Sequence, residues 1–216
     1  MKEIVVIGGS NPDVLQLISD IADADESWRL IGVLDDAMEK GALVLDAPVL
    51  GPLESWRDLD SQVCFAQSIV SKPRTTRSIV QRLKIPRERF PNLIHPRAIV
   101  FRDRAGAARL GQGNLVLQGS SIQPGAVMGD YNYVNINCVV GHDAVVGDYN
   151  SFGVAATITG RCRIGDACYI GSGSVITNGA AVGDQCFVCA GTVVSRTLKP
   201  GGKVMGNPAR TLPSSE

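Results

Sequence analysis

The chain has 216 residues, enough for one large domain or two small ones, and its 21 basic and 21 acidic residues cancel to a formal net charge of zero. This balance gives no indication of a nucleic-acid partner or of binding to an anionic membrane surface. No apolar run approaches membrane-spanning length, and no charged segment precedes a cleavable apolar one, so we expect a cytoplasmic protein.

The first ninety residues alternate between short strands and helices. Glu3–Gly8 has the pattern of an apolar strand that ends in glycines, and residues 12–22 have helical spacing. Leu30–Asp36 predicts a second strand, ending in paired acids, and residues 63–70 predict a third, with a helix near 75–83. Such alternation predicts a small parallel sheet with helices on its faces.

Ligands of parallel sheets bind at the carboxyl ends of the strands. The residues that follow the three strands are therefore candidates for substrate binding. They are Gly8, Ser10, Asp35, Asp36 and Lys72. For the paired acids, a solvated turn after a strand is the alternative interpretation.

The second half of the chain repeats every six residues. Every sixth residue from Leu110 to Val194 is apolar, and a small side chain follows four positions later. A period of six excludes an amphipathic helix, which needs about 3.6. It predicts a solenoid of short strands with three hexads in each coil, so that residues eighteen apart lie above one another. An earlier hexad at Ile94 predicts a partial first coil, and residues 100–109 break the register as a loop.

The stacking also predicts which cysteines are neighbours. Cys168 and Cys186 share a column with Asn132 and Asn150. The sequence holds one C-x-x-C pair, Cys186–Cys189, with no second such pair to complete a four-cysteine zinc site. We interpret this column as a ladder of small inward residues, with a redox pair as the alternative in an oxidising compartment.

The repeat resembles the left-handed β-helix of the hexapeptide-repeat acyltransferases. With the small α/β domain before it and the segment V-M-G-N-P-A-R (Val204–Arg210) after it, the chain resembles one branch of that family. This branch holds the bacillosamine-type UDP-amino-sugar N-acetyltransferases and the sialic acid O-acetyltransferases. The expected fold is a Rossmann-like α/β domain over 1–92, an all-β left-handed parallel β-helix over 93–199 and a tail over 200–216.

One loop departs from the family pattern. Relatives carry a loop like G-x-x-G-H-G after the first strand, whose N–H groups cradle the phosphates of a nucleotide. Here the loop is G-G-S-N-P-D (Gly8–Asp13). Pro12 has no N–H to donate, and Asp13 adds a negative charge. Nucleotide-sugar binding is therefore lost or takes a different pose in this chain.

The resemblance also assigns catalytic residues. Acyl transfer from a thioester needs a base for the proton of the acceptor, a donor for the carbonyl oxygen and a groove for coenzyme A. His142 matches the catalytic histidine of the family and falls at a corner of the coil. Asp143 matches an acid thought to raise the basicity of that histidine, and Asn135 matches a residue near the acceptor. A surface histidine on a turn is the alternative for His142, and His95 is interpreted as structural.

The co-substrate that the resemblance implies is acetyl-CoA, with no metal. Many relatives have a second histidine nine residues after the first, whereas this chain has Ser151, whose hydroxyl can still donate a hydrogen bond. Other positions matching contacts to acetyl-CoA are Gly160, Ser172, Ala190, Asn207, Pro208 and Arg210. Lys203 is a further candidate for its phosphates. Ordinary turn residues and a solvated tail are the alternatives.

Together these features predict an acetyl-CoA-dependent N-acetyltransferase that modifies the amino group of a nucleotide-linked deoxysugar, with His142 as general base. Family members are usually homotrimers, and outward-facing Tyr131, Tyr133 and Val154 are expected to pack against a partner. A sugar O-acetyltransferase and a non-catalytic trimeric scaffold remain the alternatives. Two histidines in the chain exclude a carbonic anhydrase of the γ class, which needs three on zinc.

Overall fold

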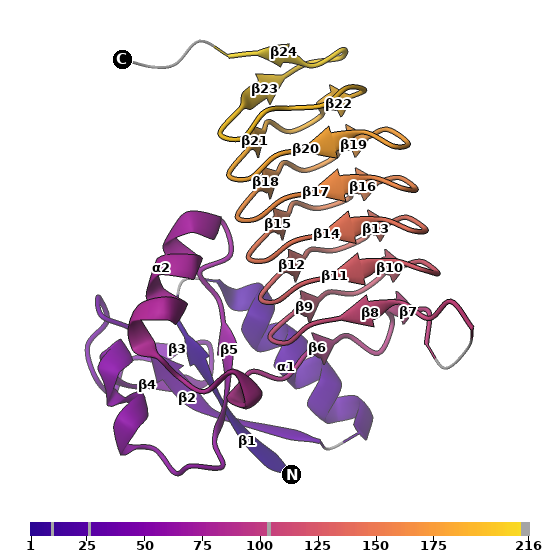
Figure 1. The fold of residues 1–216 in the computed structure, drawn as a ribbon. Coiled ribbons are helices and arrows are strands. Elements are labelled where there is room, and N and C mark those ends of the chain that lie inside the picture. Colours follow the sequence, from indigo (N-terminus) through magenta and orange to yellow (C-terminus); the bar gives the residue numbers. More distant parts are fainter. Residues whose placement is uncertain (10, 26, 103–104, 213–216) are drawn as a thin grey trace.

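The computed structural model describes residues 1–9, 11–25, 27–102 and 105–212, which form a small α/β domain beside a tall three-sided coil (Figure 1). The α/β domain holds a sheet of order β3-β4-β2-β1-β5. Its strands are β1 (Lys2–Ile7), β2 (Trp28–Leu34), β3 (Leu43–Val44), β4 (Ala47–Gly51) and β5 (Cys64–Gln67). Its helices are α1 (Pro12–Asp25), α2 (Pro73–Leu83) and the short 3-10 helices η1 (Leu53–Asp58) and η2 (Arg87–Arg89).

Helix α1 packs between one face of this sheet and the solenoid. Strand β1 pairs in parallel with both β2 and β5, and its apolar side chains are buried. On one face, the apolar side of α1 packs over Ile4 and Val6 and against Leu115, Leu117 and Tyr133 of the solenoid. Helix α1 is therefore held between the sheet and the coil, because burying both sides of the helix removes apolar surface from water.

The repeat region is a parallel β-helix of two-residue strands. Its first face continues the contact with the α/β domain, and the other two faces follow at each turn of the chain (Figure 1). The first face holds β6 (Leu93–Ile94), β9 (Leu115–Val116), β12 (Tyr133–Val134), β15 (Ser151–Phe152), β18 (Tyr169–Ile170) and β21 (Phe187–Val188), then β23 (Lys203–Met205) and β24 (Arg210–Thr211). The second face holds β7 (Ile99–Val100), β10 (Ser121–Ile122), β13 (Val139–Val140), β16 (Thr157–Ile158), β19 (Val175–Ile176) and β22 (Val193–Val194). The third face holds β8 (Arg109–Leu110), β11 (Val127–Met128), β14 (Val145–Val146), β17 (Arg163–Ile164) and β20 (Ala181–Val182).

The register agrees with the six-residue repeat. From β8 to β22, strands pair in parallel with the strand eighteen residues away, as Tyr133 does with Ser151. The first coil pairs at a spacing of 22 residues, because the segment between β7 and β8 is longer. The second residue of each strand points inward, and these aliphatic side chains form one continuous buried core. The expected partial coil at Ile94 is present as β6 and β7, and residues 101–108 separate β7 from β8.

A ladder of small polar and thiol side chains runs up one inner corner of the coil. The Nδ2 groups of Asn132 and Asn150 each donate to the Oδ1 of the asparagine eighteen residues earlier, at 3.0 Å. Cys168 continues the column, since its N–H donates to Asn150 Oδ1 at 2.8 Å. The thiols of Cys168 and Cys186 are free and donate to the carbonyl groups of Gly183 and Lys199. These contacts agree with a ladder of inward residues.

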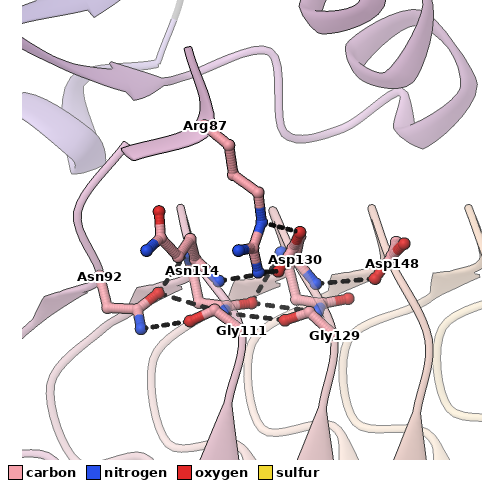
Figure 2. A network of polar contacts seen from close by, with 9 residues as sticks. Arg87, Asn92, Gly111, Asn114, Gly129, Asp130 and Asp148 are labelled. Atoms are coloured by element: carbon pink, nitrogen blue, oxygen red, sulfur yellow. Dashed lines mark hydrogen bonds and ion pairs between the residues drawn. The ribbon is translucent and has the colours of Figure 1, made fainter. Parts of the chain in front are cut away.

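An ion pair joins the two domains at the base of the coil. Figure 2 shows Arg87, from η2, extending to Asp130 on the solenoid, where its Nε and Nη2 each lie 2.6 Å from a carboxylate oxygen. Asp130 Oδ1 also accepts the N–H of Gln112 at 2.8 Å. The Arg87 hydrogen bond lowers the pKa of the Asp130 carboxyl group. Such a bidentate pair fixes orientation as well as distance.

Asn92 makes a second connection beside this ion pair (Figure 2). Its Nδ2 donates to the carbonyl oxygen of Gly111 at 2.6 Å, and its Oδ1 accepts the N–H of Asn114 at 2.8 Å. The amide therefore extends the asparagine ladder by one step, into the segment that leads from the α/β domain.

The expectation that Tyr131 and Tyr133 pack against a partner was wrong. Tyr131 and Tyr133 are 6% and 2% exposed, because the chain's own α/β domain covers them. Tyr131 packs edge-on against Phe90, and the Tyr133 hydroxyl lies 3.3 Å from Asp13 Oδ2. Burial raises the pKa of the Tyr133 phenol. Val154 is 40% exposed and stays available to a partner.

The last coil is closed by a hairpin. Strand β23 extends the first face in parallel with β21, and β24 then folds back antiparallel to β23. Among the described residues, no helix has the length and apolar character needed to cross a membrane.

Candidate active site

His142 lies at the corner between β13 of the second face and β14 of the third. Its side chain is 49% exposed, and Nδ1 lies 2.9 Å from Asp143 Oδ2, so the two neighbours are in contact. Asp143 adopts a left-handed backbone conformation with φ of 57°, which aspartate tolerates better than most residues. The Asp143 N–H donates to the carbonyl oxygen of Pro124, one coil earlier, at 3.0 Å. This turn holds the carboxylate against the imidazole.

Two glycines shape this corner, and one of them, Gly160, makes the space in which the imidazole lies. A Cβ on Gly160, one coil further along, would come within 2.3 Å of His142 Nε2. A Cβ on Gly141 would meet the Gly160 nitrogen at 2.6 Å. Within the described part of the chain, Nε2 has no hydrogen-bond partner. Nδ1 is therefore occupied by Asp143, and Nε2 is the nitrogen left to exchange a proton.

Arg161 is a neighbour that the sequence reasoning missed. Its N–H donates to the carbonyl oxygen of His142 at 2.8 Å, and its side chain is exposed at the same corner. The signal was present in the repeat, because Arg161 follows Asp143 by eighteen positions and so stacks upon it. A cation here is a candidate contact for an anionic group of a ligand.

Asn135 and Ser151 lie away from this corner. Asn135 is at the corner between the first and second faces, and its Oδ1 accepts the N–H of Ile136 at 2.7 Å. Ser151 is 4% exposed and pairs on the first face with Tyr133 and Tyr169. Within one chain, neither residue joins His142.

The other positions assigned to acetyl-CoA form an exposed edge. Ser172 and Ala190 stack at the corner between the first and second faces, and both are exposed. The turn with Asn207 and Pro208 follows at the end of that edge, held by a hydrogen bond from the Val193 N–H to the carbonyl oxygen of Gly206 at 3.1 Å. Small side chains along this edge fit an extended pantetheine arm, and the exposed guanidinium of Arg210, in β24, fits a phosphate.

The candidate substrate residues gather at the carboxyl edge of the α/β sheet, but their carboxylates are already engaged. Asp35 Oδ2 accepts the N–H of Gly9 at 2.7 Å, and Asp36 Oδ1 accepts that of Leu53 at 2.9 Å. Gly8 lies beside this pair, with its N–H bonded to the carbonyl oxygen of Leu34. The other two candidates are placed differently. Lys72 precedes α2 and is exposed, and Ser10 lies outside the described residues.

His95 has structural contacts. It is 7% exposed, its Nδ1 accepts the N–H of Arg97 at 2.9 Å, and its Nε2 lies 3.0 Å from Asp20 Oδ2 on α1. Because Nδ1 is an acceptor, the ring proton sits on Nε2 and is donated to Asp20, which ties α1 to the start of the coil. Across the described ranges, no cluster of three or more His, Cys, Asp or Glu side chains could hold a metal ion.

Comparisons with known proteins agree with this architecture. The family model described as bacterial transferase hexapeptide (six repeats) matches residues 161–196. The acetyltransferase domain of PglB from Neisseria gonorrhoeae FA1090, solved with acetyl coenzyme A, is 27% identical with a TM-score of 0.84, over 98% of this chain and 99% of that one. The chain has the repeat and the fold of the hexapeptide-repeat sugar acetyltransferases.

Two more solved structures extend the comparison. A variant of perosamine N-acetyltransferase from Caulobacter crescentus, in complex with CoA and GDP-perosamine, is 25% identical with a TM-score of 0.85, over 99% of this chain and 98% of that one. WeeI from Acinetobacter baumannii AYE, at 22% identity and a TM-score of 0.83 over 98% of this chain and 100% of that one, shares the fold. No curated protein matches the sequence. The predicted resemblance, the α/β plus left-handed β-helix fold and the acetyltransferase class are confirmed.

The candidate residues of one chain lie on two different sides of the solenoid. The α/β domain packs on the first face of the solenoid, through Leu115, Leu117 and Tyr133. His142 lies at the corner where the second and third faces meet. One chain therefore presents its candidate base and its candidate substrate edge on different sides of the coil.

Proposed function

We propose that this chain transfers the acetyl group of acetyl-CoA to an amino group on a nucleotide-linked deoxysugar, with His142 as the general base. The observation that carries the proposal is the His142–Asp143 pair, half-exposed above Gly160, in a chain with this acetyltransferase fold. A histidine that served only as a surface turn residue would need neither a bound carboxylate nor a glycine cleared beneath its ring.

The residues suit a direct transfer. The nitrogen of the acceptor attacks the thioester carbonyl, so that a C–N bond forms and the C–S bond breaks. His142 Nε2 takes the proton that the nitrogen loses and returns it to the departing sulfur, which balances the reaction as amide plus free thiol. In the neutral imidazole, an Nδ1 proton donated to Asp143 leaves Nε2 as the nitrogen with a free lone pair, and the carboxylate stabilises the imidazolium that forms when Nε2 takes the proton.

Similarity to known enzymes supports the choice of reactants. The PglB domain was solved with acetyl coenzyme A, and the perosamine N-acetyltransferase with CoA and GDP-perosamine. For this chain, acetyl-CoA would lie along the edge of Ser172 and Ala190 toward Arg210 and the turn of Asn207 and Pro208. Gly160, at the His142 corner, would approach it from a second copy. The nucleotide sugar would lie at the edge of the α/β sheet.

A homotrimer in the cytoplasm completes the proposal. The candidate base and the candidate substrate edge face different sides of one chain, so a second copy is needed to bring them together. Val154, which is 40% exposed at the corner of the first and second faces, is available for that contact. In a trimer, the corner with Asn135 and the Ser172 edge of one chain would face the His142 corner of the next.

Substitution of His142 tests the proposal. With UDP-, GDP- and dTDP-linked amino sugars as acceptors, free thiol released from acetyl-CoA measures turnover. We expect His142→Ala to lower kcat by about 10²–10⁴ while the fold and acetyl-CoA binding remain. Asn178→Ala is a matched control, since Asn178 is exposed at the same corner two coils further along.

Full turnover by His142→Ala would contradict the role of the base and leave the non-catalytic scaffold as the explanation. If sialic acid or another sugar hydroxyl is acetylated, and no nucleotide-linked amine reacts, the O-acetyltransferase alternative holds in place of the N-acetyltransferase.

A further inference from the structure

The first βα turn of this chain is poorly suited to phosphate. The Gly9 N–H donates to Asp35 Oδ2 at 2.7 Å, and the Asp13 N–H donates to Asn11 Oδ1 at 2.9 Å. Pro12, at the start of α1, has no N–H. Among the described residues of this turn, the N–H groups of Gly9 and Asp13 are thus already bound within the protein, and Pro12 has none to offer a phosphate.

The charge at this turn is also unfavourable. The carboxylates of Asp13, Asp35 and Asp36 follow the first two strands of the sheet, and Asp13 lies 3.3 Å from the Tyr133 hydroxyl. One cation, Arg82, lies 3.3 Å from Asp36 and is half-exposed. A diphosphate at the turn would face repulsion from these carboxylates.

A basic groove opens at the same sheet edge, beyond the neighbouring strand β5. It has a volume of about 670 Å³ and lies between the segment that begins α2 and the outer first face of the solenoid. We name it the α2 groove. Its lining residues are Ser71, Lys72, Pro73, Arg74, Thr75 and Ser78 on one wall, and Ala167, Tyr169, Gln185, Cys186, Phe187 and Lys203 on the other.

The charged residues that line the α2 groove are all positive. Lys72 and Arg74 come from the α/β domain and Lys203 from β23, and none of the lining residues is acidic. In the described part of the chain, none of these three cations lies within 4.0 Å of a carboxylate. Their charge is therefore available to an anionic ligand, and it comes from both domains.

The solenoid wall of the α2 groove adds a flat aromatic surface. The rings of Tyr169 and Phe187 stack with centroids 4.9 Å apart at an interplanar angle of 14°, and Phe187 is 41% exposed. An exposed ring beside unpaired cations suits a ligand with a planar base and a phosphate group, because the base stacks and the phosphate pairs.

We propose that the nucleoside diphosphate part of the substrate binds in the α2 groove, with the base on Phe187 and the phosphates on Lys72, Arg74 and Lys203. The inference rests on the proposed function and gives its substrate a place that avoids the acidic first turn. Since Lys72 follows β5, which pairs with β1, the groove belongs to the carboxyl edge where such sheets bind ligands.

Calorimetric titration of the whole protein, without acetyl-CoA, tests the site with UDP, GDP and inorganic pyrophosphate as probes. We expect Arg74→Gln and Lys203→Gln each to weaken the binding of all three probes about tenfold, and higher salt to weaken binding in the wild type. Phe187→Ala should weaken UDP and GDP while leaving pyrophosphate unchanged. Arg163→Gln, an exposed cation on the third face, is the control and should change nothing.

The competing location is the first turn, tested by Asp13→Asn. The proposal would be overturned if nucleotide affinity rose in Asp13→Asn and stayed unchanged in Arg74→Gln and Lys203→Gln. It would also be overturned if no probe bound at millimolar concentration. The proposed function fails separately. Nucleotide binding that depends on the groove cations, together with no acetyl transfer to any amino sugar, would keep the groove and reject the reaction. Acetyl transfer with the same KM for the nucleotide sugar in Arg74→Gln, Lys203→Gln and the wild type would support the reaction and reject the groove.

Discussion

The imidazole of His142 lies directly over Gly160 of the next coil, where a Cβ would come within 2.3 Å of Nε2. Gly160 has an ordinary backbone conformation, since it is not among the residues of positive φ. Glycine is therefore needed here to leave room for the imidazole of the candidate base, and not to allow an unusual backbone conformation.

Gly160→Ala should displace the imidazole and lower kcat by about tenfold to a hundredfold, because a shift of about 1 Å at a catalytic group is costly. Steady-state kinetics with an accepted amino sugar measure the effect. The same substitution made in His142→Ala provides the control, since it should then cost nothing further. An equal loss in both backgrounds would mean that Gly160 acts on something other than the histidine.

Asp143 can be tested by a graded pair of substitutions. Asp143→Asn keeps an acceptor for the Nδ1 proton but removes the charge, whereas Asp143→Ala removes both. We expect kcat to fall about tenfold for alanine and less for asparagine. The coil already holds alanine in this left-handed conformation at Ala155 and Ala167, with φ of 56° and 52°, so the fold should persist. Unchanged kcat in Asp143→Ala would show that the carboxylate does not orient the base.

The Arg87–Asp130 ion pair should stabilise the joined domains in a pH-dependent way. Because Arg87 lowers the Asp130 pKa below 3.8 in the folded protein, its contribution is complete at pH well above that value and is lost as the pH falls through the folded pKa. A double-mutant cycle with Arg87→Gln and Asp130→Asn, measured by urea unfolding, should give a coupling of about 1 kcal/mol at pH 7. The coupling should shrink below about pH 4, and a constant value from pH 7 to pH 3 would contradict the assignment.

Two substitutions in one column compare the asparagine ladder with the thiols above it. Asn132→Ala deprives the N–H and Nδ2 groups of Asn150 of their acceptor, so we expect a loss of about 2–3 kcal/mol in the free energy of unfolding. Cys168→Ala removes one thiol donor and little volume, and about 1 kcal/mol is expected. Chemical denaturation measures both values. Equal losses would show that the amide ladder contributes no more than packing does.

The solenoid was readily predictable because its repeat encodes both direction and register. The six-residue period placed His142 at a corner and stacked Cys168 upon Asn150, and the hydrogen bond between that pair follows from the same spacing. A local rule sufficed, since each coil contacts mainly the coils before and after it.

The contacts between domains were not predictable from that rule. The period shows that Tyr131 and Tyr133 point outward, but it carries no information on what covers them, and the covering elements come from far along the chain. The hydrogen bond from the Gly9 N–H to Asp35 likewise depends on how the ends of β1 and β2 are placed next to each other, which neither segment alone predicts. Arg161 was overlooked because stacking was applied to inward residues and not to the corner of His142.

The antiparallel return of β24 onto β23 has a consequence for solubility. A stack of parallel coils that simply stopped would leave open N–H and C=O groups at its top, ready to accept a strand from another molecule and grow into a filament. The returning strand covers the first face of that site, and its direction is opposite to that of the coils, so this face offers no template for a further parallel turn. Loss of this hairpin would therefore expose the first-face edge of the last coil to strand addition from another molecule.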